Sequence, residues 1–304
     1  NPTLEVLDIE KLARIPVNVE IASEFRYRDP ILLPNDLVIL LSQSGETADT
    51  ITAVKRAEER GAHILVLTNR EDSSIVRHAG SLLPLKAGIE VSVAATKSYT
   101  AQLTCLYLLG LALASARGSL LPAELGKLRD ELRQLPAKME KALSEDGKVK
   151  AAAERLKDYR QMIYIARGVN LPTAQEGALK LKEISYVNAN GYPAGELKHG
   201  PIALLDENMP VTAVLAPGGR VYDKMISNCE EARARHAFLT GVSFDGDRRA
   251  EELFDLLLTV PSTAEIFSPL LLNLPLQLLA YYIADLLGRE VDQPRNLAKS
   301  VTVE

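Results

Sequence analysis

Short runs of consecutive apolar residues mark the first strands that the sequence predicts. Residues 37–41 and 62–67 form two such runs, which are typical of strands buried on both faces. Between them, residues 47–60 carry apolar side chains at helical spacing, with charged side chains on the other face and Gly61 as the stop. This order of strand, helix and strand predicts a parallel sheet joined by a right-handed crossover.

The second half of the chain repeats this arrangement. The pattern predicts a strand at 211–215, a helix at 222–235 and a further strand at 237–240. The apolar segment 82–84 has a counterpart at 259–261, and each of the two precedes a long apolar helix. Because corresponding segments lie at a nearly constant offset, we predict an α/β fold in which a three-layer α/β/α domain with a parallel sheet is duplicated.

The duplication also predicts where the domains lie. A strand at 162–166 opens the second copy, and its counterpart in the first copy would fall before residue 1. We therefore expect the first domain to lack its opening strand and the loop after it. We place the first domain at 1–143, the second at 144–288 and an irregular C-terminal tail at 289–304.

Composition and charge are those of a globular protein, and we expect it to be cytoplasmic, because its two cysteines are too few for a disulfide framework. Hydrophobic residues make up 47% and charged residues 25% of the chain, and its formal net charge is -5, so we expect neither nucleic acid nor membrane as a partner. The longest apolar stretches, 103–114 and 269–287, are too short or too interrupted by polar residues to span a bilayer. No His, Cys or carboxylate cluster has metal-ligand spacing, so we expect no metal and no cofactor.

The strongest local motif is Ser-Gln-Ser-Gly-Glu-Thr at 42–47, where the first predicted strand passes into a helix. Hydroxyls, a glycine and the amide hydrogens at the start of a helix form a good site for a phosphate, and ligands gather at the carboxyl ends of parallel strands. A simple helix cap by Ser44 or Thr47 is the alternative. Three hydroxyls together are more than a cap needs, which favours an anion site.

Three charged residues share one face of the helix predicted at 173–187. Glu176, Lys180 and Glu183 are spaced for contact along that face. A ladder of ion pairs on a solvated surface is the usual meaning of such spacing. The alternative is a pocket in which Glu183 carries protons and Lys180 tunes it.

Two further residues are candidates by their positions. His199 lies in a turn-rich loop, where functional residues concentrate, whereas the other histidines lie in or beside regular elements. Lys299 is close to the end of the chain, where fraying is common. Apolar residues around it favour docking instead, and a docked lysine could form a Schiff base with a sugar carbonyl.

Taken together and in order, these motifs resemble the isomerase half of the glutamine:fructose-6-phosphate amidotransferases, or glucosamine-6-phosphate synthases. That half is built of two flavodoxin-like sugar isomerase (SIS) domains. The resemblance covers nearly the whole chain. It rests on the segments 20–28, 42–50, 93–97, 176–186, 195–201 and 291–304.

The resemblance implies roles for individual residues. The phosphate of fructose 6-phosphate would be held by Ser42, Gln43, Ser44 and Thr47. His199 would serve the site of a neighbouring subunit and help to open the sugar ring. Lys299 would engage the C2 carbonyl of the open ketose, and Glu183, with Lys180 close by, would move a proton between C1 and C2. The backbone at Val93 and Ala298 would contact the sugar.

The resemblance also implies partners. The chain would act as a homodimer that converts fructose 6-phosphate to glucosamine 6-phosphate, with ammonia from a glutaminase domain that this sequence does not contain. Ala95 stands where many members carry serine. Two other readings stay open: a sugar-phosphate sensor without catalysis, and a deglycase acting on glycated amino acids.

Overall fold

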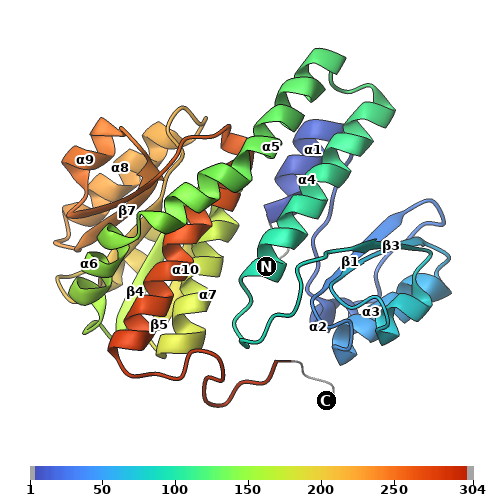
Figure 1. Cartoon of the computed structure of the whole chain (residues 1–304), viewed down its shortest axis with the longest axis horizontal. Helices are drawn as coiled ribbons and strands as arrows, with labels where there is room; N and C mark the ends of the chain where they lie inside the picture. Colours follow the sequence, from blue (N-terminus) through green and yellow to red (C-terminus); the bar gives the residue numbers. More distant parts are fainter. Residues whose placement is uncertain (1–3, 300–304) are drawn as a thin grey trace. The chain divides into compact units, whose positions relative to one another are not determined.

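The computed structural model describes residues 4–299, which fall into two compact units (Figure 1). The N-terminal unit consists of the chain up to Arg117 together with the end of the tail from Asn296, and the C-terminal unit of Gly118–Arg295. Residues 1–3 of the first predicted domain and residues 300–304 of the predicted tail lie outside the described residues. Where the two predicted domains begin and end stays a prediction.

The N-terminal unit contains a parallel sheet and the helices that pack on it. Its elements are α1 (Leu4–Ala13), α2 (Ala22–Phe25), β1 (Leu37–Ser42), α3 (Ala48–Glu59), β2 (His63–Thr68), the short 3₁₀ helix η1 (Ser74–His78), β3 (Ser81–Pro84) and α4 (Lys97–Arg117). The two apolar runs and the helix between them are therefore confirmed to within a residue or two.

The register of this sheet brings its loops together at one edge. The strands run parallel in the order β1-β2-β3. Ser42 at the end of β1 pairs with Thr68 at the end of β2, and Thr68 pairs with Pro84 at the end of β3. The loops that follow the three strands consequently leave from the same carboxyl edge, where α/β sheets bind ligands.

Apolar side chains fill both faces of this sheet. On one face Leu40 and Val66 pack with Val54 of α3, and on the other Leu67 packs with Leu106 of α4. Helices thus cover both faces, as the continuous apolar runs predicted.

The C-terminal unit is larger and contains a second parallel sheet. Its elements are α5 (Pro122–Ser144), α6 (Gly147–Leu156), β4 (Gln161–Ala166), η2 (Gly168–Asn170), α7 (Leu171–Ser185), β5 (Asn188–Pro193), η3 (Ala194–His199), η4 (Pro201–Leu204), β6 (Val211–Val214), α8 (Tyr222–Arg233), β7 (Leu239–Phe244), α9 (Arg248–Leu253), β8 (Leu256–Val260), η5 (Glu265–Phe267) and α10 (Ser268–Leu286).

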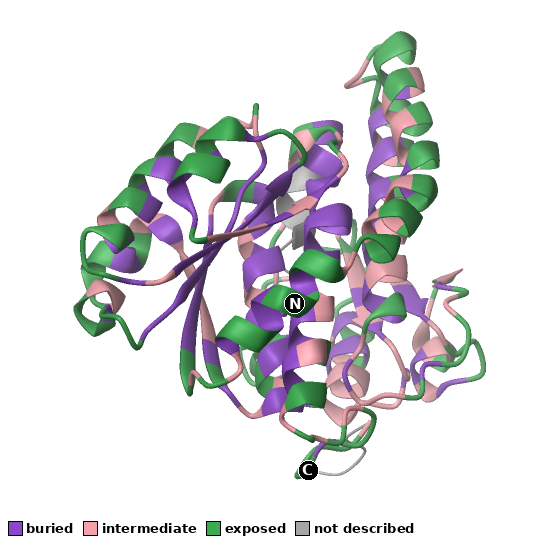
Figure 2. Cartoon of the chain, turned by 60° about the vertical axis from the view of Figure 1, so that its left-hand side comes forward, coloured by how far each residue is buried: buried purple, intermediate pink, exposed green. Residues whose placement is uncertain are grey.

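The strand order of this second sheet is β5-β4-β6-β7-β8, with all pairs parallel. Its three central strands, β4, β6 and β7, are buried almost throughout (Figure 2). One apolar cluster joins the sheet to α8 and α9, while α7 and α10 pack on each other and belong to the other layer. The described strands β1, β2 and β3 correspond to β6, β7 and β8, and β4 and β5 have no counterpart among the described strands of the N-terminal unit.

Two sequence predictions in this unit were inaccurate. The strand predicted at 237–240 is wrong in position, because β7 runs over Leu239–Phe244. Gly241 interrupts the apolar run there because a Cβ would lie 2.6 Å from the Phe254 ring. The strand β5 was not predicted, because its sequence of Asn, Gly and Pro is that of an edge strand with little to bury.

The helices α4 and α10 are long and apolar enough to cross a bilayer by length and composition, a property that buried core helices share. The helix α10 is buried along most of its length and packs against α7 and α6. The helix α4 packs against α1 and the first sheet. We therefore interpret both as core helices.

Candidate functional site

The motif at 42–47 forms the tight loop between β1 and α3. The Ser42 hydroxyl oxygen accepts a hydrogen bond from the Gly45 N–H at 2.9 Å, and the Ser44 hydroxyl oxygen accepts one from the Glu46 N–H at 3.2 Å. Because both hydroxyl oxygens act as acceptors within the loop, their own hydrogens are left to donate to another group. The predicted cap by Thr47 is not formed, because its side chain makes no capping hydrogen bond to α3.

A neighbouring segment fixes the shape of this loop. Gly45 has a φ of +68°, and a Cβ at this position would lie 2.1 Å from the Ser73 hydroxyl oxygen, so only glycine fits. The Ile75 N–H donates to the Gly45 carbonyl at 3.1 Å, and the Ser74 N–H donates to the Glu46 carboxylate at 2.8 Å. The hydrogen bond from Ser74 lowers the pKa of Glu46, which therefore stays ionised in this position.

Asn69 connects the loops after β2 and β3. Its side-chain oxygen accepts from the Ala87 N–H at 3.0 Å, and its side-chain nitrogen donates to the Gly88 carbonyl at 2.7 Å. Next to it, the Thr68 hydroxyl reaches the Gln43 carbonyl at 3.5 Å. The three loops at the carboxyl edge thus form one hydrogen-bonded group.

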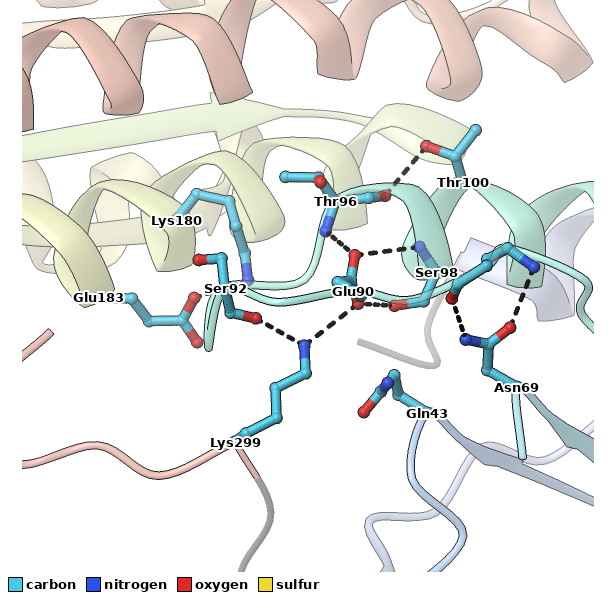
Figure 3. A network of polar contacts seen from close by, with 12 residues as sticks. Gln43, Asn69, Glu90, Ser92, Thr96, Ser98, Thr100, Lys180, Glu183 and Lys299 are labelled. Atoms are coloured by element: carbon cyan, nitrogen blue, oxygen red, sulfur yellow. Dashed lines mark hydrogen bonds and ion pairs between the residues drawn. The ribbon is translucent and has the colours of Figure 1, made fainter. Parts of the chain in front are cut away.

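Lys299 docks on the loop that follows β3. Its ammonium donates to the Ser92 carbonyl at 2.6 Å and lies 3.3 Å from a carboxylate oxygen of Glu90 (Figure 3). The alternative of a frayed end is therefore wrong for this residue. Gln43 of the β1–α3 loop points its side chain toward that of Lys299 in Figure 3.

The carboxylate of Glu90 is almost fully enclosed, with 3% of its side chain exposed. One oxygen accepts from the N–H groups of Thr96 and Ser98, and the other accepts from the Ser98 hydroxyl. Burial by itself raises the pKa of Glu90, but the hydrogen bonds from Ser98 and Thr96 and the charge of Lys299 outweigh it and leave the pKa below its ordinary value. Glu90 is therefore ionised.

The predicted residues Val93 and Ala298 lie beside this network. Val93 is partly buried and follows Ser92, whose carbonyl accepts from Lys299. Ala298 is exposed and directly precedes Lys299. Their backbone groups are therefore close to the docked lysine.

The charged residues of α7 form a buried group in the C-terminal unit. The Lys180 ammonium lies 2.6 Å from a carboxylate oxygen of Glu183 and 3.3 Å from one of Glu176. The solvated ladder is wrong, because only 5% of the Lys180 side chain and 4% of the Glu176 side chain are exposed. Burial by itself lowers the pKa of Lys180, but the two carboxylates outweigh it and raise the pKa, so the lysine is charged.

Glu183 differs from Glu176 in its access to solvent. Its side chain is 21% exposed, whereas that of Glu176 is 4% exposed. A carboxylate that pairs with a buried ammonium and still reaches solvent can exchange protons with a bound molecule. Glu176 is too enclosed for that and instead supports the lysine.

His199 ends the short 3₁₀ helix η3 and is exposed. The preceding Gly195 allows the close approach of Arg167, whose guanidinium would lie 2.6 Å from a Cβ at this position. Arg167 is itself held by Asn228, to which it donates at 3.0 Å. The structure therefore presents the imidazole to solvent from an anchored turn.

Sequence reasoning missed Glu90 and Asn69. Asn69 bonds the loop after the next strand, and Glu90 faces Lys299 from the far end of the chain. Neither residue lies in a motif that signals its role. An acidic residue between the apolar Ile89 and Val91 was the one available signal. Within residues 4–299, no group of three or more His, Cys, Asp or Glu side chains could hold a metal ion.

Comparisons with known proteins agree with this geometry. The SIS domain family model matches residues 6–112 and 155–285. The chain is 52% identical over 297 residues to the glutamine-fructose-6-phosphate aminotransferase (isomerizing) of Gloeobacter violaceus, with 97% of this chain and 49% of that protein covered. The corresponding protein of Thermosynechococcus vestitus is 50% identical, with 97% of this chain and 49% of that protein covered. The chain thus spans about half the length of these relatives.

A solved structure matches the chain over almost its whole length. It is the C-terminal domain of glucosamine-fructose-6-phosphate aminotransferase from Francisella tularensis, with a TM-score of 0.90 and 39% identity. The match covers 96% of this chain and 82% of that one. The chain therefore belongs to the SIS domain family, among the relatives of this C-terminal domain.

Proposed function

We propose that this chain is the isomerase module of a glutamine:fructose-6-phosphate aminotransferase, which binds fructose 6-phosphate and forms glucosamine 6-phosphate. The observation that carries the proposal is the docking of Lys299 within the unit that contains the 42–47 loop. The names of the relatives that match 97% of the chain support the same substrate.

The 42–47 loop would bind the phosphate. The hydroxyls of Ser42 and Ser44 and the side chains of Gln43 and Thr47 lie on it, at the start of α3. The free N–H groups at a helix N-terminus carry partial positive charge and stabilise an anion without a lysine or arginine. A hydrogen bond between a neutral donor and a phosphate is also stronger than one between neutral groups.

His199 and Lys299 would prepare the sugar for reaction. Ring opening moves a proton between the anomeric hydroxyl and the ring oxygen, which suits an imidazole near neutral pH. Lys299 would then engage the C2 carbonyl of the open ketose, with the backbone of Val93 and Ala298 against the chain of the sugar. Ammonia replaces the C2 oxygen, which leaves as water, and an imine results.

Glu183 would move the proton that completes the reaction. It takes a proton from C1 of the imine and returns one to C2, while the proton of the C1 hydroxyl passes to the imine nitrogen, so that C1 becomes an aldehyde and C2 carries the amine. Carbon C1 is oxidised as C2 is reduced, so the step is balanced within the substrate. Lys180, paired with Glu183 at 2.6 Å, would hold the carboxylate in position by a hydrogen bond.

The partners of this module follow from the same proposal. Ammonia would come from glutamine through a glutaminase domain, in keeping with the word glutamine in the relatives' names. The chain would act as a cytoplasmic homodimer, because His199 would serve the site of the partner subunit. The exposure of His199 in this chain is compatible with such a role.

The test is to incubate the chain with fructose 6-phosphate and ammonium ions and to follow glucosamine 6-phosphate by mass spectrometry. We expect product with the wild-type chain, and glucose 6-phosphate when ammonium is omitted. The Lys299→Met variant should form neither. Tight binding of fructose 6-phosphate by the wild-type chain without either product would overturn the proposal and indicate a sugar-phosphate sensor.

A further inference from the structure

Glu90 lies at the meeting point of two parts of the N-terminal unit. One carboxylate oxygen accepts from the N–H groups of Thr96 at 2.8 Å and Ser98 at 3.2 Å, at the start of α4. The other accepts from the Ser98 hydroxyl and faces the Lys299 ammonium at 3.3 Å. A single side chain thus joins the N-terminus of a helix to the C-terminal tail (Figure 3).

The loop around Glu90 turns this carboxylate inward and its apolar neighbours outward. Its neighbours Ile89 and Val91 are 85% and 70% exposed, while the acidic side chain between them is buried. This reverses the usual distribution, in which apolar side chains are buried and carboxylates are exposed. The loop therefore leaves two apolar residues in solvent in order to turn Glu90 inward.

Glu90 does not depend on Lys299 to satisfy its carboxylate oxygens. Glu90 keeps three hydrogen bonds, from Thr96 and Ser98, when the lysine is absent. The carboxylate is therefore a preformed acceptor, and the departure of the lysine does not leave it unsatisfied. Such an arrangement holds a side chain in place and still allows it to move to a substrate.

We propose that Glu90 is a positioning residue that docks the C-terminal tail and places Lys299 at the carboxyl edge of the first sheet. The inference rests on the proposed function only for what Lys299 then does. A purely structural role, as the cap of α4, would need only the contacts with Thr96 and Ser98. Capping does not explain why Lys299 approaches the second carboxylate oxygen, whose other hydrogen bond comes from the Ser98 hydroxyl.

The test uses trypsin, which cleaves after lysine, as a reporter of tail docking. In the Glu90→Gln variant, the remaining side-chain oxygen can still accept from the N–H groups of Thr96 and Ser98. An NH₂ group replaces the oxygen that faces Lys299. Intact-mass measurements follow the removal of residues 300–304 over time. We expect this removal to be at least about tenfold faster than in the wild-type chain. In turnover of fructose 6-phosphate, kcat should fall while KM changes little.

Ser98→Ala is the matched control, because it weakens the cap of α4 but leaves the charge that faces Lys299. Its stability to urea should fall, and its cleavage after Lys299 should stay within about twofold of the wild type. Glu90→Asp, which keeps the charge, should be cleaved more slowly than Glu90→Gln. Equal cleavage of Glu90→Gln and the wild-type chain, or equal acceleration in Ser98→Ala, would overturn the inference. Because cleavage needs no turnover, the inference can fail or hold independently of the proposed function.

Discussion

Lys180 and Glu183 form a hydrogen-bonded ion pair along α7, with 2.6 Å between the ammonium nitrogen and a carboxylate oxygen. The same ammonium is 3.3 Å from Glu176, so one buried lysine serves two carboxylates of different exposure. The arrangement separates a support, Glu176, from a group that reaches solvent, Glu183. We therefore predict that replacing Glu183 and replacing Lys180, the two partners of the 2.6 Å pair, affect activity and stability differently.

Glu183→Gln should abolish most turnover without unfolding the chain. Lys180 keeps Glu176 as its partner in this variant, so no buried charge is left alone. Loss of a general acid–base group lowers kcat by about 10²- to 10⁴-fold.

Lys180→Met should instead cost about 3–5 kcal/mol of unfolding free energy, because it leaves the buried Glu176 carboxylate uncompensated. Steady-state kinetics and urea unfolding of both variants check this, and similar losses of stability in the two would contradict it.

Gly45→Ala should impair substrate binding more than its backbone strain alone explains. The added methyl would overlap Ser73, so the 42–47 loop has to shift. Gly61→Ala is the matched control, because its φ is +73° and no atom lies within 4 Å of the added Cβ. Each variant should lose about 1–2 kcal/mol from the left-handed backbone conformation. We expect KM for fructose 6-phosphate to rise at least about tenfold in Gly45→Ala only. Equal KM values in the two variants would argue against a binding role for the loop.

Ser44→Ala should weaken the binding of fructose 6-phosphate by about 10- to 150-fold, because it removes a hydrogen bond to a charged group. Thr52→Val tests whether any hydroxyl in this region has such an effect. The Thr52 hydroxyl donates to the Ala48 carbonyl inside α3 at 3.0 Å and should not contribute to affinity. Titration calorimetry measures both variants. Wild-type affinity in Ser44→Ala would reassign its hydroxyl to loop structure.

The sequence predicted the parts of the fold whose signal is local. The strands β1 and β2 are continuous apolar runs because helices pack on both faces of their sheet, and such runs are visible without any neighbour. The strand β5 exists only because β4 offers its backbone, and its polar residues carry no signal of that pairing. The later part of β7 was likewise hidden, because Gly241 fits a close approach by Phe254 that only the fold creates.

For the candidate site, spacing predicted proximity but not environment. Glu176, Lys180 and Glu183 were expected on one face, and they contact each other there. Their burial could not be predicted from spacing. Asn69 was missed because the parallel strands bring its partner loop to it, and Glu90 was missed because its ionic partner Lys299 lies in the C-terminal tail.

The contribution of Glu90 to stability should depend on pH in a defined direction. Its pKa in the folded chain lies below the ordinary 4.5, so the ionised form is favoured by folding. The stabilisation is therefore complete above pH 4.5 and is lost as the pH falls through the lowered folded pKa. The difference in urea midpoint between the wild-type chain and Glu90→Gln should be constant from neutral pH to pH 4.5 and should shrink below it. A difference that vanishes well above pH 4.5 would contradict the ionised, hydrogen-bonded carboxylate.

Mixing two inactive variants should restore activity if His199 serves a partner subunit. His199→Ala retains Lys299, and Lys299→Ala retains His199, so one of the two sites in a mixed dimer contains both residues. Random exchange of subunits makes half of the dimers mixed, and about a quarter of the wild-type activity should therefore return. Refolding the two variants together promotes the exchange, and the separately refolded variants are the control. If the mixture stays inactive while native mass spectrometry shows mixed dimers, His199 and Lys299 must act from the same subunit.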